Sequence, residues 1–225
     1  MASLPQKCLA ECLGVYILCS FGNGAVAQTL LYSGDKAGLL DIHLAYGMAV
    51  TLAVYVTGKV SGAHLNPAVT LAECVFGRFE WRHAPHYFLS QILGGFISSV
   101  MVWLVYMDMD KDMTTAGIFA TYPRDDISLI QALIDEIIGT IMLVLCLHAL
   151  VDNDNTKPPA GFEPFFVGIT VFTIGAAFGI NTGYAINPAR DLGPRLFTLV
   201  AGWGGEVFSR GNNKVWKKFQ IFLNN

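Results

Sequence analysis

The sequence predicts an all-α membrane protein, built as an inverted repeat that carries two re-entrant half-helices. Two observations predict this class. The chain of 225 residues is 53% hydrophobic and only 14% charged, with a mean hydropathy of +0.49, whereas a soluble domain carries about a quarter charged residues. The triplet Asn-Pro-Ala also occurs twice, each time after a Gly-containing lead-in. We expect five full transmembrane spans, and the sixth span of such a repeat is missing.

Each triplet predicts the start of a short helix. The two triplets are Asn66, Pro67, Ala68 and Asn187, Pro188, Ala189. Asn is a strong helix N-cap, and Pro is best tolerated at the first helical position. The segments 69–77 and 190–201 that follow hold roughly ten residues each, about 15 Å at 1.5 Å per residue. Because this is half of a ~30 Å hydrocarbon core, we expect two half-helices that meet in the middle of the membrane.

Long apolar segments account for the five spans, at residues 8–31, 39–58, 84–106, 127–151 and 164–181. Lys59, Arg78 and Arg82 lie on one side of this plan, and an acidic connector at 108–126 lies on the other. The positive-inside rule therefore places the N-terminus in the cytoplasm. No small-residue cleavage site follows closely after the start, which indicates a first span rather than a signal peptide.

A second pair of motifs extends the repeat. Glu-x-x-Gly stands inside the first span at Glu11 and inside the fourth span at Glu136. The two glutamates precede Asn66 and Asn187 at similar distances. Each half would thus contain span, span, half-helix and span, and an odd number of spans per half places the halves in opposite orientation.

The repeat predicts one membrane domain over residues 1–225. Its first half covers residues 5–106, and its incomplete second half covers residues 127–212. Segment 213–225 is too short and too basic to cross a bilayer about twenty residues deep. We expect it to be a tail that lies outside the repeat.

These motifs together resemble the major intrinsic protein (aquaporin) family, and within it the aquaglyceroporin branch. The resemblance covers about residues 5–212 and ends there. It rests on the two triplets, the lead-ins 61–65 and 183–186, and the continuation 189–194. Asp191 directly after Arg190 marks the glycerol-conducting branch. The resemblance implies six tilted helices with two half-helices, and a homotetramer in which each protomer has its own pore, if assembly survives the missing span.

Two opposed helix starts suit a pore for small neutral solutes. Each start concentrates unpaired N–H groups and about half a positive charge, and such ends, with an Arg, repel cations and protons. The amides of Asn66 and Asn187 are expected to donate to a passing oxygen. Irregular backbone at this depth is tolerable where it lines a wet cavity. The expected carbonyl ladder consists of Gly62, Ala63, His64, Leu65, Gly183, Ala185 and Ile186.

The resemblance also implies a selectivity filter, formed by Tyr46, Gly175, Tyr184 and Arg190. Gly175 stands where strict water channels place a His, so a wider opening with two aromatic walls is expected. Glu11 and Glu136 are expected to accept hydrogen bonds from the loop N–H groups, although a proton relay is an alternative for such buried acids. His43 and His148 are expected to be ordinary helix residues near the membrane surface.

The leading hypothesis is a passive channel for glycerol and water that excludes ions and protons. Its expected partners are glycerol, water, urea or other small neutral solutes, and the lipid bilayer, in the plasma membrane. One alternative is a secondary transporter of small solutes, which also uses broken helices. Another is a truncated, non-conducting isoform that misfolds or modulates a full-length sibling.

Several function classes have little support in the sequence. No nucleophile with an adjacent base indicates an enzyme, and no Cys-x-x-Cys or Cys/His spacing indicates a metal or cofactor. The net charge of -3 and the lack of a basic stripe argue against a nucleic-acid partner.

Overall fold

The computed structural model describes residues 2–32 and 38–209, which contain helices, turns and loops and no strands. The long helices are α1 (Leu4–Leu31), α2 (Leu39–Ser61), α4 (Ala84–Val105), α6 (Leu129–Val151) and α7 (Glu163–Thr182). The shorter ones are α3 (Pro67–Val75), a single turn η1 (Trp81–His83), α5 (Met113–Phe119), α8 (Pro188–Thr198), η2 (Leu199–Trp203) and α9 (Glu206–Ser209). The predicted tail at 213–225 lies outside the described residues.

The five long helices are those that the sequence predicts. Within the described residues they are the helices long and apolar enough to cross a membrane, so the all-helical, multi-pass membrane class is confirmed. Helix α1 begins before its apolar run because Ser3 caps it, with the Ser3 N–H donating to Gln6 Oε1 over 2.8 Å. The predicted absence of a sixth span concerns residues after 209, which lie outside the described residues.

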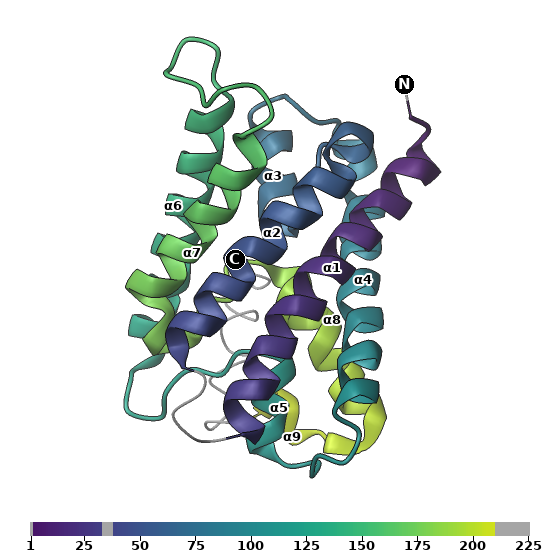
Figure 1. Cartoon of the computed structure of the whole chain (residues 1–225), viewed down its shortest axis with the longest axis vertical. Coiled ribbons are helices and arrows are strands. Elements are labelled where there is room, and N and C mark those ends of the chain that lie inside the picture. Colours follow the sequence, from purple (N-terminus) through teal and green to yellow (C-terminus); the bar gives the residue numbers. More distant parts are fainter. Residues whose placement is uncertain (1, 33–37, 210–225) are drawn as a thin grey trace.

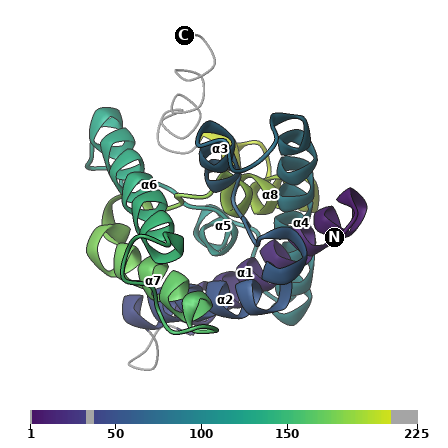
Figure 2. The ribbon, with the colours of Figure 1, turned by 90° about the horizontal axis from the view of Figure 1, so that it is seen from above.

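The long helices stand side by side along the longest axis, while α3 and α8 occupy opposite parts of that axis (Figure 1). Seen from above, the long helices form an open arc in the order α6, α7, α2, α1 and α4 (Figure 2). Helix α5 lies near the middle of this arc, and α3 and α8 lie at its open side, between α6 and α4. Helices α2 and α7 cross where both carry a glycine. A Cβ at Gly47 would lie 2.8 Å from the carbonyl oxygen of Gly168, so small residues permit this close contact, as is common between membrane helices.

Helix α5 is a feature that the sequence did not predict, because it lies in the expected polar connector. The side chain of Asp112 caps it, accepting from the N–H groups of Thr114 and Thr115 at 2.8 Å each. Phe119 at its end is fully buried and stacks against Phe197 and Trp203. A helix of seven residues between polar segments has too few turns to show a periodic apolar pattern.

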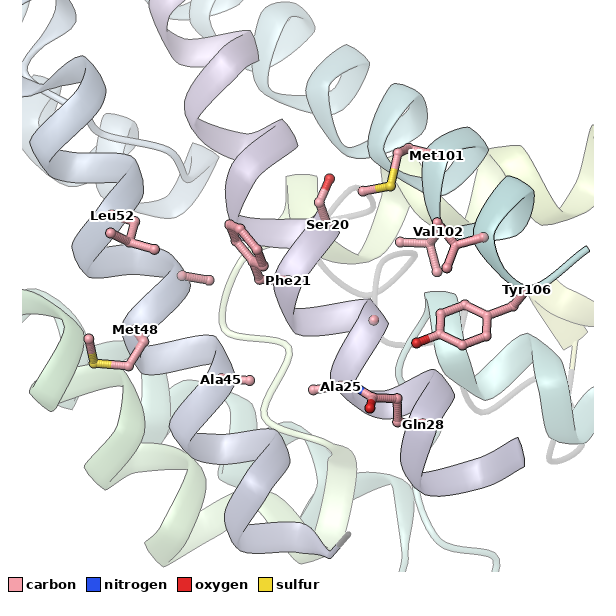
Figure 3. A pocket seen from close by; sticks show the side chains of 13 residues that line it. Ser20, Phe21, Ala25, Gln28, Ala45, Met48, Leu52, Met101, Val102 and Tyr106 are labelled. Carbon is pink, nitrogen blue, oxygen red and sulfur yellow. The ribbon is translucent and has the colours of Figure 1, made fainter. Parts of the chain in front are cut away.

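A cavity of about 420 Å³ lies on the outside of the bundle, between α1, α2 and α4 (Figure 3). Its lining is largely apolar and includes Phe21, Met48, Leu52 and Met101. It contains none of the residues that the sequence predicts for the pore. The candidate site therefore lies elsewhere, in a second cavity that α1, α2, α6 and α7 line together with the two short helices α3 and α8.

Candidate functional site

The two Asn-Pro-Ala triplets form the helix starts that the sequence predicts. Asn66 caps α3, and its Oδ1 accepts from the N–H of Ala68 at 2.8 Å. Asn187 caps α8, and its Oδ1 accepts from the N–H groups of Ala189 and Arg190 at 3.0 and 3.3 Å. Both asparagines are buried. Each cap uses the oxygen of the amide and leaves its nitrogen for other partners.

The two helix starts are hydrogen-bonded to each other across the pseudo-symmetric repeat. Asn66 Nδ2 donates to the carbonyl oxygen of Ile186 at 2.8 Å, and Asn187 Nδ2 donates to the carbonyl oxygen of Leu65 at 2.8 Å. The sequence predicted that these amides and carbonyl oxygens face a solute, and it did not predict the two bonds between them. Because an amide has two N–H groups and a carbonyl oxygen has two lone pairs, each group retains one position for a solute.

The loops before the two triplets have the same unusual backbone. Ala63 and Leu65 have φ values of 49° and 55°, and Tyr184 and Ile186 have φ values of 39° and 38°. L-residues in this left-handed region cost ~1–3 kcal/mol each and persist only where their surroundings hold them. The matching pattern in the two loops supports the inverted repeat. Because the backbone is strained in both loops, other residues must hold each loop in place.

Glu11 supplies that support in the first half. It is fully buried, and its carboxylate accepts from the N–H groups of His64 and Leu65 at 3.0 and 2.7 Å. It also accepts from Ser61 Oγ at 2.6 Å and from Gln91 Nε2 at 2.8 Å. Four donors satisfy both carboxylate oxygens, which is the arrangement expected for a group that holds a loop in place.

Glu136 makes the corresponding contacts in the second half. Its carboxylate accepts from the N–H groups of Ala185 and Ile186 at 3.1 and 2.9 Å. The neighbouring Asp135, to which the sequence analysis gave no role, accepts from Thr182 Oγ1 at 2.7 Å just before the loop. Both ends of the second loop are thus held by adjacent carboxylates of α6.

Arg190 is buried and held from two sides. Its Nη1 donates to the carbonyl oxygen of Phe119 at 2.8 Å, and its Nη2 donates to the hydroxyl of Tyr46. The guanidinium carbon lies 4.9 Å from the centre of the Tyr46 ring. The Tyr46 hydroxyl in turn donates to Oδ1 of Asn23 at 2.6 Å. Asn23 and Phe119 could not be predicted from the sequence, because neither belongs to a motif.

Asp191 connects the second half-helix to the segment after α5. Its Oδ1 accepts from the N–H and the hydroxyl of Thr121 at 2.8 and 3.0 Å. Arg195, with a side chain only 2% exposed, pairs with the same carboxylate at 2.9 Å. Since Thr121 is two residues after Phe119, this contact fixes the carbonyl that orients Arg190. The predicted branch marker, Asp191, therefore has structural contacts next to Arg190.

The aromatic residues predicted for the filter lie together. The rings of Tyr46 and Tyr184 are 6.2 Å apart at an angle of 79°. Gly175 lies behind Tyr184, where a Cβ would be 2.7 Å from Tyr184 Cζ. His43 Nδ1 lies 3.1 Å from the Tyr184 hydroxyl, and His43 is buried. The expectation that His43 is an ordinary helix residue near the surface is therefore wrong, because α2 turns it inward toward Tyr184.

One cavity of about 370 Å³ joins these groups. Its lining includes both amide asparagines, both tyrosines, Arg190 and most of the two loops, namely Gly62, Ala63, His64, Leu65, Ala185 and Ile186. Gly183 is not among the lining residues and packs against Thr121 instead. Glu73 and His148 also line the cavity, and His148 Nε2 lies 2.8 Å from Oε1 of Glu73. His148 is therefore not the ordinary helix residue that the sequence suggested.

Comparison with known proteins gives the family. The model of the family described as Major intrinsic protein matches residues 1–224. The chain belongs to the major intrinsic protein family. The match runs past residue 212, where the sequence analysis ended the resemblance, into residues that the structure does not describe.

Its relatives within the family are aquaporins. The chain is 46% identical to Aquaporin-10 of Homo sapiens over 224 residues, which covers 95% of this chain and 74% of the relative. It is 43% identical to Aquaporin-9 of Homo sapiens, covering 96% of this chain and 77% of the relative. It is 41% identical to Aquaporin-7 of Mus musculus, covering 95% of this chain and 74% of the relative.

The fold of the chain also matches a solved structure. The X-ray structure of the aquaglyceroporin from Plasmodium falciparum superimposes with a TM-score of 0.86 at 31% sequence identity. The similarity covers 96% of this chain and 89% of that chain. The aquaporin-like fold that the sequence analysis expected is confirmed.

Proposed function

We propose that the chain forms a passive channel that conducts glycerol and water across a membrane and excludes ions and protons. The observation that carries the proposal is the single cavity in which Asn66 and Asn187 meet Arg190 and the two tyrosines. Membership of the major intrinsic protein family supports a channel rather than an enzyme or a secondary transporter. The structural similarity to an aquaglyceroporin supports glycerol as a solute.

The cavity offers both hydrogen-bond donors and acceptors to a hydroxyl-bearing solute. The second N–H of each asparagine amide and the remaining N–H groups of Arg190 are donors, and the loop carbonyls are acceptors. The rings of Tyr46 and Tyr184 provide an apolar wall for a carbon chain. A cation meets two helix N-termini and a guanidinium, so it loses its water without compensation.

Tyr46, Gly175, Tyr184 and Arg190 are the proposed selectivity filter. Gly175 contributes through its lack of a side chain, because any Cβ there would collide with the ring of Tyr184. The two tyrosine rings stand nearly perpendicular to each other beside the guanidinium. The filter therefore combines one charged edge with two aromatic faces, which suits a polyol lying with its hydroxyls toward Arg190.

Further properties follow from the same proposal. We expect urea to pass as well, the protomers to assemble as a homotetramer, and the N-terminus to face the cytoplasm in the plasma membrane. The C-terminal end of α2 and the segment between α3 and α4 lie toward the end of the molecule that holds the N-terminus (Figure 1). These segments contain Lys59, Arg78 and Arg82, which supports this orientation. Urea flux, chemical crosslinking and accessibility of an N-terminal tag in intact cells test the three points separately.

The function is tested by stopped-flow measurements on proteoliposomes. Glycerol permeability is expected to exceed that of empty liposomes, to stay proportional to concentration and to carry no current. Saturating, ion-coupled uptake would instead support a secondary transporter. An absence of flux from chain that is inserted in the bilayer would favour the non-conducting alternative.

A pair of tryptophan variants tests the route of the solute. Val69 lines the central cavity, whereas Val105 lines the outer cavity and is 64% exposed. Val69→Trp is expected to obstruct the pathway and lower glycerol flux, and Val105→Trp is expected to leave it near that of the unmodified chain. Equal effects of the two variants would contradict a pathway through the central cavity.

A further inference from the structure

His43 lies where it can control one wall of the proposed filter. It is on α2, three residues before Tyr46, and three-residue spacing places the two side chains on the same helix face. Its Nδ1 is 3.1 Å from the Tyr184 hydroxyl. The two rings are 5.2 Å apart and meet edge to face at 65°. A single face of α2 thus supplies Tyr46 to the filter and His43 to the residue opposite it.

Two glycines of α7 make the space that this pair occupies. A Cβ at Gly175 would lie 2.7 Å from Tyr184 Cζ and 2.8 Å from His43 Nδ1. A Cβ at Gly179, one turn later, would lie 2.8 Å from His43 Cε1 and 3.0 Å from Tyr184 Cδ1. The imidazole and the phenol therefore fill a slot whose floor is bare backbone, and neither ring has free space on that side.

The backbone of Tyr184 does not hold the side chain in place by itself. Its φ of 39° places it in a strained part of the loop, and its ring reaches from the loop to the cavity next to Tyr46 and Arg190. A tyrosine ring turns about χ1 and χ2, so its position depends on what the hydroxyl contacts. In the described residues, the hydrogen-bond partner of that hydroxyl is His43.

We propose that His43 is a positioning residue of the filter, which holds the Tyr184 ring and thereby sets the largest polyol that passes. This inference rests on the proposed glycerol channel. When the imidazole is removed, a void opens behind Tyr184, and its hydroxyl loses a partner. The ring can then move into the void and away from Arg190. The opening widens on one side, which favours a four-carbon polyol more than it favours glycerol or water.

The experiment compares erythritol, glycerol and water permeability in proteoliposomes. His43→Ala is expected to raise the ratio of erythritol to glycerol permeability by at least about twofold, and Tyr184→Phe, which removes the same hydrogen bond, is expected to raise it similarly. The double variant should show no more than the larger single effect, because both changes break one contact. His43→Gln, whose amide can still reach the hydroxyl, should restore much of the original ratio.

His86→Ala is the matched control, because His86 is exposed on α4 and its change should leave the ratio unaltered. Water permeability of each variant reports the amount of folded channel. A His43→Ala channel with flux of all three solutes reduced in proportion, or with an unchanged ratio, overturns the inference. Additive effects of the two single variants also overturn it. If the unmodified chain itself conducts no glycerol, the proposed function fails first, and this outcome is visible in the same data.

Discussion

The side-chain amide of Asn66 donates to the carbonyl oxygen of Ile186, which lies 120 residues later in the chain. The reciprocal bond runs from Asn187 to Leu65. These two bonds join the strained loops of the two halves at the point where both half-helices begin. The asparagines thus have a structural function, capping one helix and linking to the opposite loop, in addition to facing the cavity.

One substitution can test the bond between the two loops without removing the helix cap. Asn66→Ser keeps a good N-cap, but its short side chain cannot reach Ile186. We expect the buried carbonyl to lose a donor and the fold to lose ~1–3 kcal/mol, visible as a melting temperature lower by several degrees in detergent. Asn153→Ser, in the exposed loop after α6, is the control. Equal melting temperatures for the Asn66 variant and the unmodified protein would count against the crosslink.

Glu11→Gln should weaken the first loop more than Glu136→Gln weakens the second. Glu11 accepts hydrogen bonds from four donors: two loop N–H groups and the side chains of Ser61 and Gln91. In the described residues, Glu136 accepts hydrogen bonds from two loop N–H groups. A glutamine has one acceptor oxygen, so buried donors lose partners at ~1–3 kcal/mol each. We expect lower thermal stability and lower glycerol flux in both variants.

The same glutamate variants distinguish loop support from a proton relay. Loop support predicts that the unmodified channel passes no protons, so a pH-sensitive dye inside the liposomes should not respond to an imposed pH gradient. A relay predicts a proton flux that Glu11→Gln abolishes. Proton flux in the unmodified protein would contradict the loop-support interpretation.

Tyr46→Phe should loosen Arg190. The variant keeps the ring but removes the hydroxyl that accepts from Arg190 Nη2 and donates to Asn23. Arg190 then retains Phe119 as its described partner. We expect the ratio of glycerol to water permeability to fall several-fold, since the guanidinium no longer has a single position. Tyr55→Phe, which removes a hydroxyl bonded to the Gly161 carbonyl in the exposed loop, should leave the ratio unchanged.

Asp191→Asn should destabilise the packing of α8 against the segment that follows α5. The change leaves the charge of Arg195 buried without its carboxylate, and breaking a buried pair in this way costs ~3–5 kcal/mol. It also weakens the hydrogen bonds from Thr121 to residue 191, so the Phe119 carbonyl is held less firmly. The melting temperature should drop, and Arg195→Gln added to Asp191→Asn should recover part of the loss. A double variant less stable than the single variant would disagree with this account.

Helix α5 should respond to acid through its N-cap. Hydrogen bonds from the backbone N–H groups of Thr115 and Thr114 keep the pKa of Asp112 below its usual value. A carboxyl with a lowered pKa in the folded state stabilises the helix above its unfolded pKa, and this contribution is lost as pH falls through the folded pKa. Protection factors for hydrogen exchange at 113–119, which correct for the intrinsic pH dependence of exchange, should fall below about pH 4. Asp112→Ala should show such lower protection factors already at neutral pH.

Several features could be predicted because their causes are local in the chain. The long apolar segments produce α1, α2, α4, α6 and α7, since twenty apolar residues require a spanning helix. The triplets produce capped half-helices, because Asn and Pro act on the backbone directly beside them. The contacts of Glu11 with the loop N–H groups were also predictable, because two Glu-x-x-Gly motifs at matching places indicate a shared structural task.

Other features depended on segments that are distant in sequence. Helix α5 was missed because it is short, and the roles of Asn23 and Phe119 depend on where α1 and α5 pack against α8. His43 looked ordinary because its partner, Tyr184, is 141 residues away.

The sequence by itself determined how many long helices the described chain contains, where the half-helices start and which motifs repeat, because hydrophobic length and helix capping are properties of adjacent residues. Only the tertiary structure decided what Arg190, His43 and the two asparagine amides contact. Those contacts are hydrogen bonds of side chains to elements that are distant in the chain, and their 2.5–3.1 Å geometry arises only when the helices pack.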